Sequence, residues 1–439
     1  MSTDIMMGER KIRSLLKIAL EHSSAEQTEA GIVTGKSALT RFANSTIHQN
    51  MGFENAEIRV RAVFGKKMAA GTTNCIDEQG IRELVDKVTT MARMRDENPD
   101  FKSLPEATAR VPEVQAWSPH TAEITPEARA AAVGEIISEA DRIDGTAAGS
   151  YSVRSFERAV MNTLGVDDYY RGTSANLVTV VTGPSGGFGY ASATAQSVDD
   201  IHAGAIGAEA AGRAFESRHP VDLEPGDYEC ILMPYAVCDM LNFMRWLGFN
   251  ALGFQEGRSF LCGKLGQQVV SDKVSIWDDG RDPRTIPTPF DIEGVAKQHV
   301  DLIKKGYACG LLYDSYTAHR EGKQSTGHAS GSNLIMASGD ATIPEMIANT
   351  RFGVMVTRFH YTNVAHLMTA SITGMTRDGT FLIQDGKIVG PVKNLRFTQS
   401  ITEALSNVDM IGSEPKLEDG VLAPALKVGK FRFSSATEF

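Results

Sequence analysis

Residues 381–389 read Phe-Leu-Ile-Gln-Asp-Gly-Lys-Ile-Val, a pattern that predicts a β-hairpin. Asp385-Gly386 can supply the two positive φ angles that a type I′ turn requires, and apolar residues flank this pair on both sides. Other stretches on the N-terminal side of the hairpin also favour strands, at residues 228–233, 274–277 and 353–361. The second half of the chain is therefore predicted to be rich in β-structure.

Two helices are expected to interrupt this β-rich region, at residues 236–247 and 293–305. On the second of these, His299 shares an apolar face with Val295 and Leu302, and we expect it to be a core histidine. The region begins after the turn signal at residues 225–227, Pro-Gly-Asp. We therefore predict a β-rich C-terminal domain at residues 223–439.

The first hundred residues alternate between helical and strand patterns. A helix is predicted within residues 10–30, a strand at 57–64, and an amphipathic helix at 81–91, where apolar residues recur every three or four positions. This order favours an α/β layer. We assign it to an N-terminal domain at residues 1–115.

A proline-punctuated stretch at residues 96–126 is typical of a linker. A helix is predicted to follow it, with Thr125 as N-cap and Pro126 at the first helical position. Strands are expected within 149–182 and an alanine-rich helix at 200–217. These elements define a central α/β domain at residues 116–222, so the predicted fold class is α+β with three domains.

The composition narrows the functional classes. The chain of 439 residues carries 44 basic and 54 acidic residues, a net charge of −10, which disfavours nucleic-acid binding. No apolar run approaches the ~20 residues that span a bilayer, and the N-terminus shows no export signal. The five cysteines are scattered and form no CxxC pair. We expect a cytoplasmic protein with reduced thiols and no membrane partner.

Several local motifs have both a functional and a structural interpretation. The glycine-rich loop at 183–189 lacks the lysine and the spacing of a phosphate-binding loop, and a flexible connection is favoured. His360 and His366 would lie ~20 Å apart on one continuous strand, too far for one metal ion. Cys262 lies near Arg258 and Lys264, but a buried inert thiol is the default. The segment 324–332 clusters Ser, Thr and His, which could position a substrate or form a solvated turn.

Four stretches in order resemble motifs of the TldD/PmbA family. They are residues 41–50 (RFANSTIHQN), residues 257–266 (GRSFLCGKLG), residues 371–383 (SITGMTRDGTFLI) and residues 391–397 (PVKNLRF). The family is described as candidate metallopeptidases, peptidase family U62, also called modulators of DNA gyrase. The resemblance implies three domains and a role in the degradation or maturation of small peptides.

The chain departs from the catalytic branch of that family. TldD-type members carry an HExxxH helix and a cysteine near the C-terminus, but the matching residues 237–247 contain no His or Glu and residues 417–424 contain no Cys. The resemblance therefore implies the PmbA (TldE-type) branch, with no cofactor on this chain and zinc only in a TldD-type partner. In place of a zinc helix, we expect an apolar core stripe. It comprises Val237, Met240, Leu241, Met244 and Leu247.

Two alternatives stay open: an independent peptidase with an unusual site, using His360, His366 or Cys262, and a non-enzymatic protein-binding modulator. We predict pairing with a TldD-type homologue or self-association, and binding of small extended peptides along exposed strand edges. The candidate peptide-binding residues are Ser325, His328, His360 and Arg377.

Overall fold

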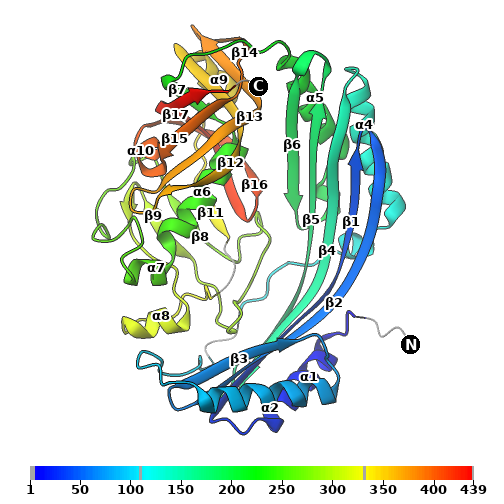
Figure 1. Ribbon diagram of the computed structural model, residues 1–439, viewed down its shortest axis with the longest axis vertical. Coiled ribbons are helices and arrows are strands. Elements are labelled where there is room, and N and C mark those ends of the chain that lie inside the picture. The colour runs from blue at the N-terminus through cyan, green and yellow to red at the C-terminus, as the bar shows by residue number, and fades with distance from the viewer. Residues whose placement is uncertain (1–4, 108–110, 330–332, 438–439) are drawn as a thin grey trace.

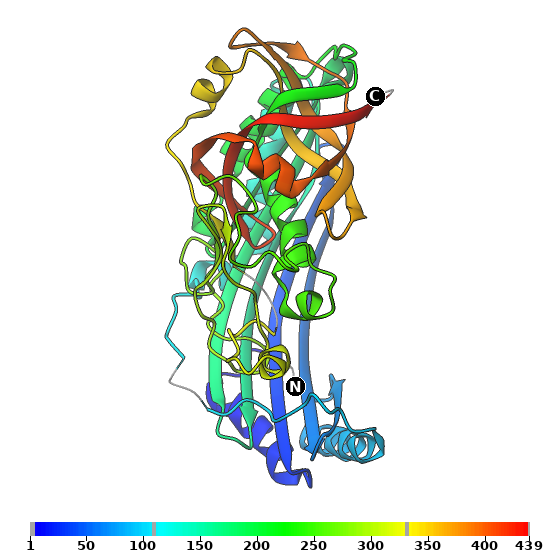
Figure 2. The ribbon, with the colours of Figure 1, turned by 90° about the vertical axis from the view of Figure 1, so that its left-hand side faces the viewer.

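The computed structural model describes residues 5–107, 111–329 and 333–437. One layer is a sheet of long, curved strands that run the length of the molecule, and a β-rich part packs beside it (Figure 1; Figure 2). The presence of both helices and strands, with the strands in two separate sheets, confirms the predicted α+β class.

The first sheet has six antiparallel strands in the order β3-β2-β1-β4-β5-β6. Its strands are β1 (Gln27–Ala43), β2 (Thr46–Phe64), β3 (Lys67–Thr73), β4 (Thr146–Asn162), β5 (Asp167–Thr182) and β6 (Phe188–Ala195). The predicted strand at 57–64 is only the last part of β2. The predicted N-terminal and central domains each contribute three strands to this sheet, and their boundary near residue 115 stays a prediction.

Helices cover one face of this sheet. Odd-numbered residues of β4 lie on that face, because Ala159 and Met161 pack with α1 and α2 while Tyr151 and Val153 pack with α4 and α5. The helical segments of this half are α1 (Glu9–His22), α2 (Glu78–Met94), α3 (Pro119–Glu123), α4 (Pro126–Asp141), η1 (Pro184–Gly186), η2 (Val198–Asp200) and α5 (Ala203–Glu216). The prediction for α4 is confirmed, since the Thr125 side chain accepts a hydrogen bond from the backbone N–H of Ala128. No helix in the described ranges is long and apolar enough to span a bilayer.

The opposite face of the first sheet, here called the inner face, is directed toward the β-rich part. Even-numbered residues of β4 lie on it, and Phe156 and Val160 pack with Phe290 from that part. The inner face is thus the side on which the two halves of the molecule meet (Figure 1).

The second sheet has eleven strands and partly closes on itself. Strand β17 pairs with both β15 and β7, and the path β17-β15-β13-β12-β7 returns to β17, so five strands form a ring. Its strands are β7 (Gly226–Leu232), β8 (Ile276–Asp278), β9 (Val300–Lys304), β10 (Tyr307–Ala308), β11 (Leu334–Met336), β12 (Phe352–His366), β13 (Ser371–Gln384), β14 (Lys387–Pro391), β15 (Leu395–Ser400), β16 (Val408–Glu418) and β17 (Val421–Ala436).

The helices of this half are short. They are α6 (Pro234–Met244), continued by the short π-helix η3 (Arg245–Phe249), then α7 (Ala251–Gln255), α8 (Ser315–Arg320), α9 (Ile343–Ala348) and α10 (Ile401–Ser406). The predicted hairpin is confirmed: β13 and β14 pair from Gln384 to Lys387, and Asp385 and Gly386 have φ of 47° and 75°.

The helix predicted at 293–305 is wrong. Residues 300–304 form strand β9, and residues 293–299 contain no helix. His299 is not a core residue either, because 45% of its side chain is exposed and its ring nitrogens lie 3.3 Å from carboxylate oxygens of Asp279 and Asp301. Val295, Leu302 and Ile303 are all buried, but Val295 lies in a loop and the other two lie on strand β9, so they do not form one helix face.

A buried ion triad ties the two halves together. Arg61 on β2 donates to Glu29 on β1 over 2.6 Å and to Glu293 of the β-rich part over 2.9 Å. Glu293 also accepts the backbone N–H of Ser315 at 3.0 Å. Burial raises the pKa of Glu29, although Arg61 opposes the shift. Burial also tends to raise the pKa of Glu293, but the charge of Arg61 and the hydrogen bonds from Ser315 have the larger effect, so the pKa of Glu293 is lowered.

Candidate functional site

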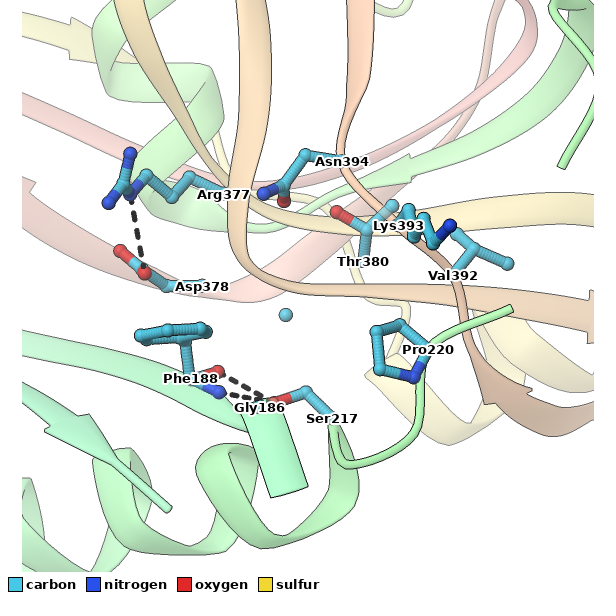
Figure 3. Close-up of a pocket in the computed structure, with 11 residues that line it drawn as sticks. Gly186, Phe188, Ser217, Pro220, Arg377, Asp378, Thr380, Val392, Lys393 and Asn394 are labelled. Atoms are coloured by element: carbon cyan, nitrogen blue, oxygen red, sulfur yellow. Dashed lines mark hydrogen bonds and ion pairs between the residues drawn. The ribbon is translucent and has the colours of Figure 1, made fainter. Parts of the chain in front are cut away.

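A pocket of about 290 Å³ lies where the end of the first half meets the β-rich part (Figure 3). One wall comes from the β5–β6 connection and the end of α5, the other from β13 and the segment before β15. Phe188, Pro220 and Val392 supply its apolar surface. The remaining lining residues are Gly186, Ser217, Arg377, Asp378, Gly379, Thr380, Lys393 and Asn394. Two of the motifs that carry the family resemblance therefore converge on one pocket.

Asp378 organises the β13 wall. Its side chain is almost fully buried and accepts a hydrogen bond from Nε of Arg358 on β12 at 2.6 Å. The backbone at Asp378 is left-handed, with φ of 56°, and β12 and β13 shift register between Val356 and Arg358. This bulge turns the side chain inward, and the ion pair with Arg358 stabilises it there.

The glycines of the 183–189 loop serve close packing. A Cβ on Gly187 would overlap the backbone oxygen of Ala214, and one on Gly189 would overlap that of Ala210, both on α5. Close approach of the loop to the helix therefore explains the absence of side chains. Gly186 and Phe188 from the same loop line the pocket.

Two predicted peptide-binding residues lie near this pocket. Arg377 lines it, and His360 lies on the neighbouring strand β12, opposite Met375. Desolvation, followed by the charges of Arg377 and Arg358, lowers the pKa of His360. The imidazole is therefore held neutral near pH 7, so it can accept as well as donate a hydrogen bond.

The other two candidates lie elsewhere. Ser325 lines a second cavity, of about 780 Å³, and donates to the backbone oxygen of Tyr313 at 3.1 Å. His328 is buried, and its two ring nitrogens contact Asp278 at 2.8 Å and Thr326 at 2.9 Å. The structure thus brings Arg377 and His360 together but separates them from Ser325 and His328. Peptide binding by all four stays a prediction.

Helix α6 occupies the position that the resemblance assigns to the zinc helix. The predicted apolar stripe is confirmed: Val237, Met240, Leu241, Met244 and Leu247 are all at most 3% exposed. Burial raises the pKa of the Cys238 thiol on this helix, whose sulfur donates to the backbone oxygens of Lys416 and Val421. These side chains do not fit a zinc site. Within the described residues, no group of three or more His, Cys, Asp or Glu is placed to hold a metal ion.

Two domain profiles of one known protein family together match most of this chain. The profile of the PmbA/TldA metallopeptidase central domain matches residues 115–218, and that of the PmbA/TldA metallopeptidase C-terminal domain matches residues 225–435. The chain belongs to the PmbA/TldD metallopeptidase family.

Members of the PmbA/TldD family resemble this chain over its full length. Metalloprotease PmbA of Escherichia coli O157:H7 is 25% identical over 450 residues, which cover 96% of this chain and 95% of that protein. The crystal structure of TldE from Thermococcus kodakarensis superposes with a TM-score of 0.86 at 18% identity, covering 97% of this chain and 99% of that one. A candidate modulator of DNA gyrase from Thermotoga maritima gives a TM-score of 0.85 at 18% identity, covering 93% and 96%. The two structures share the fold of this chain.

A polar network that the sequence did not reveal joins the two halves beside α6. Glu418, at the end of β16, accepts a hydrogen bond from Ser192 on β6, and burial raises its pKa to about 7. Lys416 contacts Tyr235 on α6 and Glu209 on α5, the latter at 2.8 Å. Except for Glu418 and Lys416, these residues are far apart in the chain, so no local motif could indicate the network.

Proposed function

We propose that this chain is a TldE-like subunit that carries no metal and acts in the cytoplasm with a TldD-type homologue in the processing of small peptides. In this proposal the homologue holds the zinc, and this chain completes the surface that binds the peptide. Self-association is the alternative if no homologue is present.

The buried apolar face of α6 carries this proposal. A catalytic zinc site needs ionisable ligands and a position open to water. Met240, Leu241 and Met244 are instead completely buried in the core of the β-rich part. The chain keeps the family fold while replacing the ligand chemistry by packing, which suits a supporting subunit.

Two features support a role in peptide binding. Strand β14 pairs only with β13 among the described strands. The backbone of Val221 donates to Pro391 at the end of β14, and the rest of its outer edge is available to an extended chain. Arg377 and His360, beside the pocket, are the residues that we assign to contact the peptide. A guanidinium and a neutral imidazole together offer donors and an acceptor to a peptide backbone or terminus.

The test compares this chain alone, a TldD-type homologue alone, and the two mixed. We expect about one zinc per homologue and none per chain after dialysis, and peptide cleavage that requires the homologue and increases with this chain. Arg377→Gln should weaken peptide binding, whereas Arg10→Gln, which changes an exposed arginine on α1, serves as a matched control. Stoichiometric zinc on this chain, or cleavage by it alone, would contradict the proposal.

A further inference from the structure

Two arginines lie on the inner face of the first sheet, four residues apart on β4. Arg154 and Arg158 are even-numbered residues of β4, on either side of Phe156, and therefore share its face. Arg154 is exposed and Arg158 half-buried. Both point toward the β-rich part, away from the helices that cover the other face.

Aromatic rings hold both guanidinium groups. Cζ of Arg154 lies 5.0 Å from the ring centroid of Phe156, and Cζ of Arg158 lies 5.9 Å from that of Tyr170. The two rings meet edge to face with centroids 5.7 Å apart. This platform orients the planar donors.

Neither guanidinium is neutralised by the protein. Among the described residues, neither forms an ion pair or a hydrogen bond, and the buried Nε of Arg158 has no partner. Desolvation and the charge of Arg158 lower the pKa of Arg154. A third cation, Lys297 of the β-rich part, also feels the charge of Arg158. Asp278 and Asp291 act on it more strongly, and its ammonium donates to Asn333 at 3.2 Å. A chain of net charge −10 thus places two arginines without an acidic partner on its inner face.

We propose that Arg154 and Arg158 form a carboxylate-binding site for the peptide, distinct from the pocket beside Arg377. Each oriented guanidinium can donate paired N–H groups to the two oxygens of one carboxylate. The carboxylate is either the peptide C-terminus or an acidic side chain. This inference rests on the proposed peptide-binding function and names the chemical class of ligand at a second position.

The same geometry has a consequence for the free protein. Like charges that lack a counter-ion destabilise the folded state, and a bound anion relieves the repulsion. Replacing both arginines should therefore raise the melting temperature of the unliganded chain while lowering its affinity for carboxylates. A purely structural pair would give the opposite change in melting temperature.

The experiment is calorimetric titration of three otherwise identical octapeptides into the full chain, alone and with the TldD-type homologue. The first has a free C-terminus, the second is amidated, and the third is amidated and carries one internal Glu. We compare wild type, the double variant Arg154→Gln/Arg158→Gln, and Arg171→Gln, an arginine on β5 whose register partner is the odd-numbered Glu157, which places it on the opposite face. Arg171→Gln should behave as wild type.

We expect wild type to prefer at least one carboxylate-bearing peptide over the plain amidated peptide by tenfold or more, and the double variant to lose that preference. Preference for the first peptide alone assigns the C-terminus, and preference for the third assigns an acidic side chain. Equal affinity of all three peptides for wild type and the double variant overturns the inference and leaves the proposed function intact. Failure of every peptide to bind, with and without the homologue, overturns the proposed function itself.

Discussion

Substitution of Arg61 by Met tests how the two halves of the molecule are held together. The change removes the guanidinium that Glu29 and Glu293 share, and both carboxylates are at least 94% inaccessible to solvent. Removing one member of a buried ionic group typically costs about 3–5 kcal/mol, because the remaining charges lose their compensation. We expect Arg61→Met to lower the free energy of unfolding by about that amount at pH 7.

The control is Arg82→Met on α2. Arg82 pairs with Glu78 at 2.7 Å, and 46% and 62% of the two side chains are exposed. A solvent-exposed pair of this kind contributes about 0–1 kcal/mol, so the control should be nearly neutral. Urea denaturation followed by circular dichroism compares the three proteins under identical conditions.

The loss caused by Arg61→Met should also depend on pH. Without Arg61, the pKa of both carboxyl groups rises, and each binds a proton in the folded state at a pH where it is ionised in the unfolded chain. The difference from wild type should therefore grow as the pH increases above the ordinary glutamate pKa of about 4.3, and shrink below it. The triple variant Arg61→Met/Glu29→Gln/Glu293→Gln should recover part of the loss at pH 7. A cost below about 1 kcal/mol, or a cost independent of pH, would refute this account.

Three further perturbations probe the packing and the network beside α6. Gly189→Ala should destabilise the protein by about 1–3 kcal/mol, since the new methyl group meets the backbone of α5, whereas Gly134→Ala, on the exposed side of α4 with open space around it, should stabilise by up to about 1 kcal/mol in the same urea titration. Met244→Ala should lower the free energy of unfolding by about 2–5 kcal/mol, because it creates a cavity in the core. Trp246 is 68% exposed, so Trp246→Ala should change that free energy by no more than about 0.5 kcal/mol. Because the pKa of Glu418 is raised to about 7, the stability that this group contributes is complete below about pH 4.3 and decreases as the pH rises through 7. The melting temperature of the wild type should fall over this range, and Glu418→Gln should reduce that fall. An unchanged pH profile of the melting temperature would contradict the assignment.

Local patterns predicted much of the fold. The caps of α4, the apolar repeat of α2 and the Asp385-Gly386 turn each depend on neighbouring residues, and all three are present in the structure. Strand β1 was not predicted, because polar residues occupy many of its positions and its stability comes from pairing with β2 and β4. Such long-range pairing leaves little trace in a short window of sequence.

The error at residues 293–305 has a similar cause. Glu293 and Lys297 are buried, so their positions follow from Arg61 and Asn333 rather than from helical periodicity. The candidate site was predicted in part: Arg377 lines the pocket, but Phe188 and Asn394 could not be assigned to it because their proximity to Arg377 arises only in the folded chain.

The pairing of β1 with β4 also sets the order in which the protein can fold. Fourteen residue pairs join these strands, from Glu29–Asn162 to Phe42–Gly149, although more than a hundred residues separate them in the chain. During synthesis, the edge of β1 that pairs with β4 stays unpaired until β4 has left the ribosome. Sheets built from such distant pairings fold slowly and expose unpaired edges to aggregation. We therefore expect fragments that end before residue 146 to be insoluble, and the nascent chain to depend on chaperones until the central strands are complete.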